Sequence, residues 1–93
     1  MGANAIITFK IMPDGTEVDV EALAKKCEEI AKEGGAKGDT KVEINPVAFG
    51  LKEIKVLAMY EMGEESFDPI AEKMDALEEV SSAEIYKMDL AMG

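Results

Sequence analysis

The feature that most constrains the fold of this chain is the order in which two hydrophobic periodicities follow one another. Four stretches have the alternating or continuously apolar pattern of strands, and they lie at residues 5–12, about 40–44, 53–60 and 83–90. Two stretches instead repeat apolar residues at the three- and four-residue spacing of a helix face. They begin near Asp19 and Ser66, and each lies between two strand-like stretches. The chain therefore predicts the element order β-α-β-β-α-β.

This order predicts an α+β fold, the ferredoxin-like βαββαβ sandwich, with a four-stranded antiparallel sheet and two helices on one face. Right-handed crossovers bring the first and third strands together at the centre of such a sheet. The third stretch, 53–60, is nearly all apolar, which suits a central strand. Lysine and glutamate alternate with apolar residues in the second and fourth stretches, as expected of edge strands. With 93 residues and no linker or repeat, we expect one domain over residues 1–93.

The expected helices have recognisable ends. Asp19 is a good N-cap for the first helix, and Gly34 and Gly35 are expected to end it. Ser66 is expected to cap the second helix, in which Pro69 is tolerated because it falls in the first turn.

The residue types that the chain lacks exclude several kinds of chemistry. Histidine is absent and Cys27 is the single cysteine, which excludes intramolecular disulfides, zinc clusters of Cys and His, and imidazole-based triads. Cys27 lies on the apolar stripe of the first helix, so we expect a buried, unreactive thiol. No carboxylate pair occupies an evident apolar pocket, and no nucleotide-binding glycine motif occurs. We therefore expect no catalytic residue, no metal site and no cofactor.

The charge of the chain limits its partners. The chain has ten lysines, no arginine and 20 carboxylates, which gives a net charge of -10. A phosphate-backbone binder needs the opposite sign, so we expect no direct nucleic acid ligand. A basic protein surface as partner and an acidic surface that serves only solubility both remain open. No run of 18 apolar residues could cross a membrane and no signal peptide is recognisable, so we expect a cytoplasmic location without membrane association.

The segment NPVAFGLKE, residues 45–53, is unusually apolar for a connection between two strands. Pro46 cannot donate a ladder hydrogen bond, so strand pairing is expected to loosen there. Gly50 permits a positive φ or a close backbone approach. Phe49 between them either folds back over the end of the core or projects outward as a contact residue. The residues alone leave both alternatives open.

Two longer segments carry a resemblance to a known family. INPVAFGLKEIKVLAMYE, and after the second helix SSAEIYKMDLAMG, resemble the archaeal elongation factor 1-beta proteins and the C-terminal exchange domain of the eukaryotic elongation factor 1-beta and 1-delta subunits. The likeness extends over essentially the whole chain, and the Pro-Val-Ala-Phe-Gly-Leu-Lys segment is its most specific part. The resemblance implies the same βαββαβ fold and guanine-nucleotide exchange on elongation factor 1-alpha, the GTPase of translation elongation. Such a factor acts by protein binding and is not an enzyme.

The resemblance also implies which residues contact the GTPase. In the eukaryotic relatives the loop with the Phe-Gly pair contacts the GTPase domain, and the C-terminal end approaches its magnesium and phosphate region. Carried over, these segments give a partner-binding set of Pro46, Ala48, Phe49, Gly50, Lys52, Met88, Asp89, Leu90, Ala91 and Met92. A near-terminal lysine is implicated in the relatives. Here no lysine follows Asp89, and Lys87 precedes the matching stretch.

Two other functions are compatible with the fold class. A ferredoxin-like regulatory domain could dimerise and bind a small molecule between subunits, and a sandwich with stacking aromatics on its open sheet face could bind RNA. The exchange factor is favoured over both, with a chain that is monomeric when free.

Overall fold

The computed structural model describes residues 4–61 and 67–91. Within them the chain forms β1 (Asn4–Pro13), α1 (Val20–Glu33), β2 (Lys37–Pro46), the short 3₁₀ turn η1 (Ala48–Gly50), β3 (Lys52–Glu61), α2 (Asp68–Asp75) and β4 (Val80–Ala91). The predicted order of strands and helices is confirmed. The strands are longer than predicted, because pairing continues past the apolar residues, most clearly in β2.

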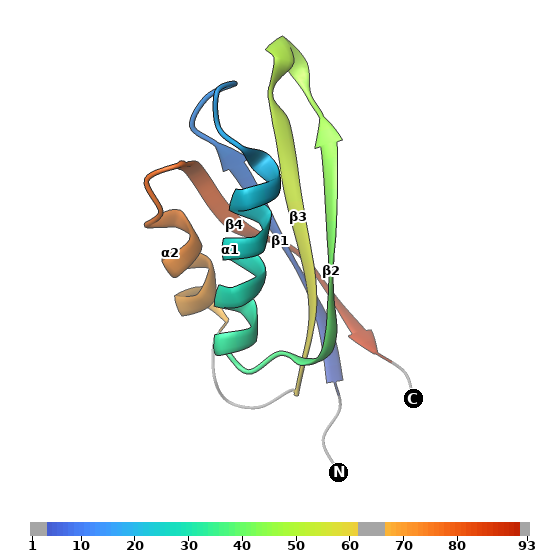
Figure 1. Cartoon of the computed structure of the whole chain (residues 1–93). Coiled ribbons are helices and arrows are strands. Elements are labelled where there is room, and N and C mark those ends of the chain that lie inside the picture. Colours follow the sequence, from blue (N-terminus) through green and yellow to red (C-terminus); the bar gives the residue numbers. More distant parts are fainter. Residues whose placement is uncertain (1–3, 62–66, 92–93) are drawn as a thin grey trace.

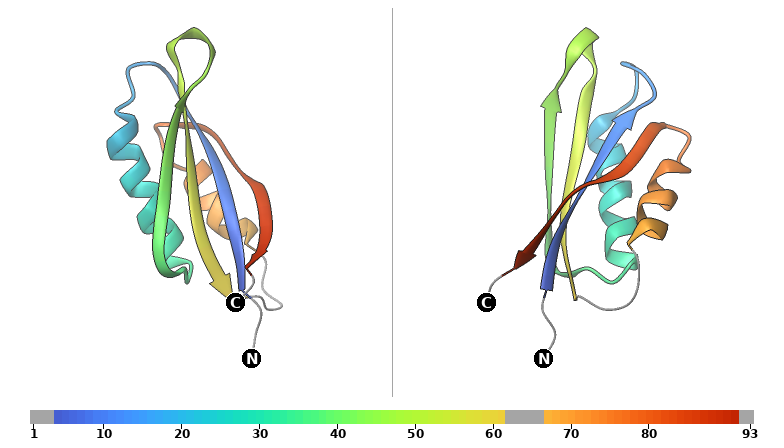
Figure 2. Two further views of the ribbon diagram at one scale, coloured as in Figure 1. Left: turned by 90° about the vertical axis from the view of Figure 1, so that its right-hand side faces the viewer. Right: turned by 180° about the vertical axis from the view of Figure 1, so that it is seen from behind.

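The four strands of the described chain form one antiparallel sheet in the order β2-β3-β1-β4. As predicted, β1 and β3 are central and β2 and β4 are the edges. Both helices pack on the same face of the sheet, and the other face carries no helix (Figures 1 and 2). The ferredoxin-like fold is therefore confirmed.

Helix α1 begins where the sequence predicts it. Asp19 is the N-cap, and its carboxylate accepts a 3.2 Å hydrogen bond from the backbone N–H of Ala22. At the other end Gly34 is still right-handed, and the reversal of the chain falls on Gly35, with φ 105°. Only Gly35 of the two therefore uses the freedom of glycine to adopt a positive φ.

Helix α2 begins differently from the prediction. Phe67 occupies the N-cap position without a side-chain hydrogen bond, and Pro69 lies in the first turn as expected. The predicted capping residue Ser66 lies outside the described residues. Phe67 instead packs its ring 5.0 Å from that of Tyr60, so an aromatic contact anchors the start of the helix.

The core lies between the sheet and the two helices. Alternate residues of β1 and β3 point into it, which is the period-two pattern read from the sequence. Its fully buried large side chains are Phe9, Ile7, Ile11, Leu23, Ile54, Met74, Val56 and Cys27. The hydroxyl of Tyr60 also lies in this core and donates a 2.9 Å hydrogen bond to the carbonyl of Ala31, which ties β3 to the last turn of α1.

Strand β4 contains a β-bulge. Thr8 pairs with Lys87 while the next residue, Phe9, pairs with Ile85, so Tyr86 is the extra residue. Its ring lies under two ammonium groups, those of Lys55 at 4.6 Å and Lys10 at 5.6 Å from the ring centroid. This irregularity interrupts the alternation that the sequence predicted for the last strand.

Candidate partner-binding site

The hairpin between β2 and β3 forms one end of the molecule. Pairing of the two strands continues to Pro46 opposite Lys52. The N–H of Val47 then donates a 2.8 Å hydrogen bond to the carbonyl of Leu51, and the N–H of Leu51 donates one of 3.2 Å to the carbonyl of Ala48. The turn is thus closed by backbone hydrogen bonds up to its last residues. Proline does not loosen the pairing as far as the sequence suggested.

Phe49 has an uncommon backbone conformation. Its φ of 62° and ψ of 29° lie in the left-handed region, and Phe49 is the only non-glycine residue with a positive φ among the described residues. Gly50 follows with φ 77°. Two successive positive φ values are those of a type I′ turn, whose twist matches that of the flanking strands. A residue with a Cβ at the first of these positions is strained, and such strain often accompanies function.

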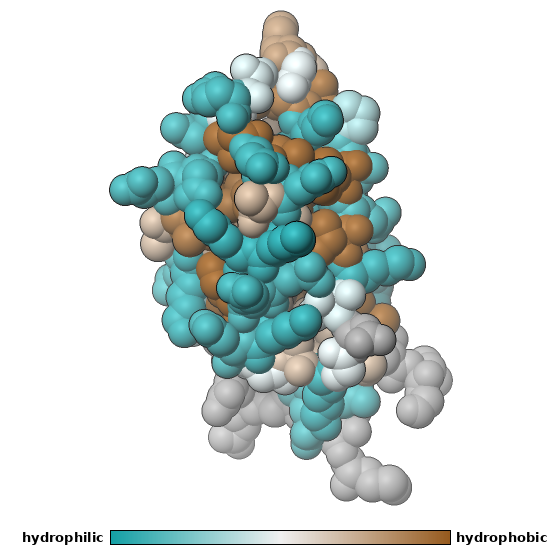
Figure 3. All heavy atoms as spheres, viewed as in Figure 1, coloured by the Kyte–Doolittle hydropathy of each residue, from teal (hydrophilic) through white to brown (hydrophobic). Residues whose placement is uncertain are grey.

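The side chain of Phe49 projects away from the protein. It is 94% exposed, and Val47 beside it is 37% exposed. Hydrophobic atoms accordingly cap the extreme end of the molecule, over the β2–β3 turn (Figure 3). The alternative that Phe49 folds back over the core is wrong, because the tight turn carries the ring beyond the end of the sheet. Five of the predicted residues, Pro46, Ala48, Phe49, Gly50 and Lys52, gather at this hairpin.

The remaining predicted residues lie at the opposite end of the sheet. Asp89 pairs with Ile6, and Ala91 pairs with Asn4, at the start of β1 (Figure 2). Met88 is 50% exposed and Asp89 is exposed, 3.6 Å from the ammonium of Lys87. Leu90 and Ala91 continue the backbone of β4, and Met92 lies outside the described residues. The predicted set therefore forms two groups that do not meet.

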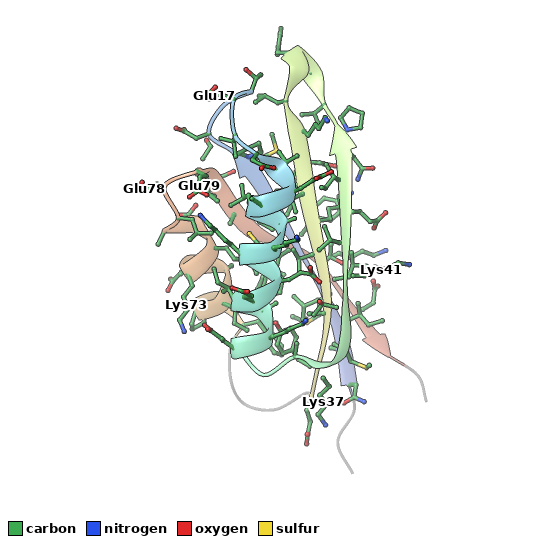
Figure 4. All side chains as sticks on the ribbon, viewed as in Figure 1. Glu17, Lys37, Lys41, Lys73, Glu78 and Glu79 are labelled. Atoms are coloured by element: carbon green, nitrogen blue, oxygen red, sulfur yellow. The ribbon has the colours of Figure 1, made fainter. Side chains whose placement is uncertain are left out.

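The connection between β1 and α1 also lies at the hairpin end, which the sequence analysis did not predict. A Cβ built on Gly50 would lie 3.6 Å from the methyl carbon of Thr16, and both residues line one hollow, so the two loops are neighbours. In Figure 4 the labelled Glu17 belongs to this connection, which lies at the same end of the protein as the hairpin. The signal was present in the sequence, because β1 runs antiparallel to β3 and its turn, Pro13-Asp14-Gly15, must fall where β3 begins.

Charge is distributed unevenly between the layers. The four strands carry six lysines and six carboxylates, so their net charge is zero. Outside the strands, the described residues hold four lysines and 12 carboxylates on the helices and connections, a net charge of -8. Hydrophilic side chains cover most of the helix-bearing side in Figure 3. The sheet is thus neutral, and the excess negative charge of the described residues lies on the helices and, for the larger part, on the connections.

The described residues supply little chemistry beyond binding. No group of three or more Asp, Glu, Cys or His side chains among them is arranged to hold a metal ion, and no helix among them is long and apolar enough to cross a membrane. Cys27 is fully buried, and burial raises the pKa of its thiol to about 11, which leaves it protonated and unreactive near neutral pH. A rigid exposed aromatic on a hairpin is, by contrast, the kind of group that anchors a protein interface. The exposed ring on this hairpin is a feature typical of protein-binding surfaces.

Comparison with known proteins identifies the family. The EF-1 guanine nucleotide exchange domain matches residues 6–90, and the chain belongs to this family. Elongation factor 1-beta of Methanococcus maripaludis strain C6 is 40% identical over 88 residues, which span 95% of this chain and 98% of the relative. Elongation factor 1-beta of Pyrococcus furiosus is 42% identical over 84 residues, covering 88% and 89% of the two chains. The expected resemblance and exchange function are confirmed, and the alternative of a small-molecule regulatory domain is not supported.

Proposed function

We propose that the chain, acting as a single domain over residues 1–93, promotes GDP release and GTP loading on elongation factor 1-alpha, with the Phe49 hairpin as one contact. The observation that carries this assignment is the 94% exposure of Phe49 on a turn whose backbone is fixed in a strained conformation. An exposed aromatic ring loses little conformational freedom on binding when its backbone is already fixed. The second contact is Met88 to Ala91 at the end of β4, together with Met92, which follows them in the sequence.

The energy available from Phe49 limits its role. Burial of one phenylalanine in a partner is worth roughly 1.5–3 kcal/mol. Because about 1.4 kcal/mol corresponds to a factor of ten, Phe49 alone could weaken the affinity of the GTPase for GDP by at most about ten- to hundredfold. A larger acceleration requires the rest of the interface to stabilise the GTPase with its phosphate and magnesium site distorted.

The separation of the two contacts supports an extended mode of binding. Nine residue steps of β3 lie between Lys52 at the hairpin and Glu61, and at about 3.3 Å per residue this is roughly 30 Å. Glu61 and Ala91 both pair with Asn4, so the end of β4 lies at that far end. A partner that touches both groups therefore spans the length of the sheet. Contacts this far apart allow binding energy gained at one end to favour a distorted nucleotide site at the other.

The charge distribution supports a basic partner surface. The acidic residues of the helices and connections attract a positively charged protein and speed the encounter, while they repel nucleic acid. In this proposal the protein is a monomer when free and lies in the cytoplasm. It makes no direct contact with RNA and carries out no covalent chemistry.

The proposal requires a particular order of affinities. A factor that bound the GDP-bound and nucleotide-free GTPase equally would shift nothing, so it must bind the nucleotide-free form more tightly. Titration of the wild-type chain against both forms of elongation factor 1-alpha by calorimetry tests this. We expect a clear preference for the nucleotide-free form, at least about tenfold. Equal affinities would contradict the proposal.

A further inference from the structure

The β1–α1 connection lies against the hairpin that carries Phe49, although the two are more than 30 residues apart in the sequence. A Cβ added at Gly50 would lie at ordinary van der Waals distance, 3.6 Å, from the methyl carbon of Thr16. Both segments leave the same end of the sheet, as Figures 1 and 4 show. A protein that covers the ring of Phe49 therefore meets this connection as well.

Between the two loops is a hollow of about 80 Å³. It is lined by Pro13, Gly15, Thr16, Val18, Gly50 and Lys52, together with Val20 at the start of α1. The lining residues include two valines and a proline beside two glycines, Thr16 and Lys52, and most of the exposed lining surface is polar. A space of this size admits a few non-hydrogen atoms, which is a short side chain. The surface at this end of the protein therefore has a projecting aromatic ring, that of Phe49, and a hollow beside it.

The connection is held in place before any partner arrives. The N–H of Asp14 donates a 2.7 Å hydrogen bond to the carbonyl of Glu79, which ties the connection to the segment before β4. At its other end Asp19 caps α1 through the N–H of Ala22. Because both ends of the connection are fixed, the hollow does not have to be ordered on binding.

We infer that the GTPase-binding surface continues from the Phe49 hairpin onto the β1–α1 connection, and that the hollow seats a short, oxygen-bearing side chain of the GTPase. This inference rests on the proposed function. Lys52 and Thr16 supply hydrogen-bond donors for an oxygen of the partner's side chain, which suits a lining that is mostly polar. Phe49 then supplies apolar contact, while the hollow fixes the register in which the partner docks.

Substitution of Thr16 tests the inference. Thr16→Trp places an indole over the hollow, and Thr16 is exposed, so the fold should not change. Lys73→Trp is the matched control, because Lys73 is exposed on α2, well away from the hairpin (Figure 4). Affinity for nucleotide-free elongation factor 1-alpha is measured by calorimetry, and thermal unfolding is recorded for each variant. We expect Thr16→Trp to weaken binding at least about tenfold, and Lys73→Trp to bind as the wild type does.

A second pair of variants tests whether Lys52 acts as a hydrogen-bond donor in the hollow. Lys52→Met keeps an unbranched side chain, one atom shorter, and removes the charged donor, and Lys73→Met is its control. We expect Lys52→Met alone to weaken binding, by several-fold to about tenfold. If the wild type binds and exchanges nucleotide but Thr16→Trp behaves like Lys73→Trp, the inference is overturned and the exchange function stands. If the wild type neither binds nor accelerates GDP release, both are overturned.

Discussion

Phe49 and Gly50 occupy successive left-handed positions, with φ values of 62° and 77°, at the turn that closes the β2–β3 hairpin. Glycine adopts this conformation without strain, whereas phenylalanine does so at a cost of about 1–2 kcal/mol. In the free protein this cost is not offset by burial of the ring, because the ring is 94% exposed. The strain is consistent with the proposed role of Phe49 as a partner contact.

Replacement of Phe49 by asparagine separates stability from function. Asparagine tolerates the left-handed region better than phenylalanine does, so Phe49→Asn is expected to raise the free energy of unfolding by about 0.5–1 kcal/mol. The same change removes the aromatic contact and should slow nucleotide exchange. Urea unfolding and GDP-release assays on one preparation measure both effects. A less stable Phe49→Asn variant would mean that the ring contributes to the fold.

Replacement of Gly50 by alanine tests the turn itself. The added Cβ would lie at ordinary contact distance, 3.6 Å, from the methyl carbon of Thr16, so crowding contributes little. The positive φ remains, and Gly50→Ala is expected to lower the free energy of unfolding by about 1 kcal/mol. Gly50→Asn should lose less, because asparagine adopts this conformation more readily. Equal losses in urea unfolding for both variants would argue against backbone strain as the cause.

The hydrogen bond from Tyr60 to Ala31 joins the sheet to α1. Tyr60→Phe keeps the ring packed against Phe9 and Phe67 and removes only the 2.9 Å bond. The Ala31 carbonyl keeps its second donor, the N–H of Ala36, so the expected loss in unfolding free energy is about 1 kcal/mol. Tyr86→Phe is the control, because Tyr86 is 53% exposed, and it should unfold as the wild type does in thermal denaturation. An unchanged Tyr60→Phe would show that the buried bond makes no net contribution.

Stability is expected to fall in alkaline solution. Burial raises the pKa of the Cys27 thiol to about 11 and that of the Tyr60 hydroxyl to about 12, both above their ordinary values. The folded state therefore keeps protons that the unfolded state loses, so the contribution is complete below about pH 9 and declines as pH rises through 11 and 12. Urea midpoints between pH 8 and 12 should decrease from about pH 9, less steeply in Tyr60→Phe above pH 10. A flat profile would contradict the assigned burial.

The fold was largely predictable because its two periodicities are local. Asp19 marked the start of α1, and the apolar run in β3 marked a central strand, since both signals depend on near neighbours in the chain. The start of α2 was not predicted correctly, because Phe67 is fixed by its contact with Tyr60, which belongs to another element. The bulge at Tyr86 was missed for a similar reason, since only the partner strand reveals an extra residue.

The site was predictable in its residues and less so in its geometry. The Phe49-Gly50 pair stood out in the sequence, but periodicity could not decide the direction of the ring, which depends on a backbone conformation rare for phenylalanine. Thr16 and Gly50 are distant in sequence, so only the antiparallel pairing of β1 with β3, and no local pattern, indicates that they are neighbours. The separation of the hairpin from the end of β4 follows only from the pairing of the strands.

The most direct test of the central claim is stopped-flow release of fluorescent GDP from elongation factor 1-alpha, with wild type and Phe49→Ala compared at equal, saturating concentrations. We expect the wild type to accelerate release strongly. With Phe49→Ala, the accelerated rate of GDP release should be about ten- to hundredfold lower. The unfolding transition of this variant should be unchanged. Release at the spontaneous rate in the presence of the wild-type chain would contradict exchange. Full acceleration by Phe49→Ala would contradict the hairpin as a contact.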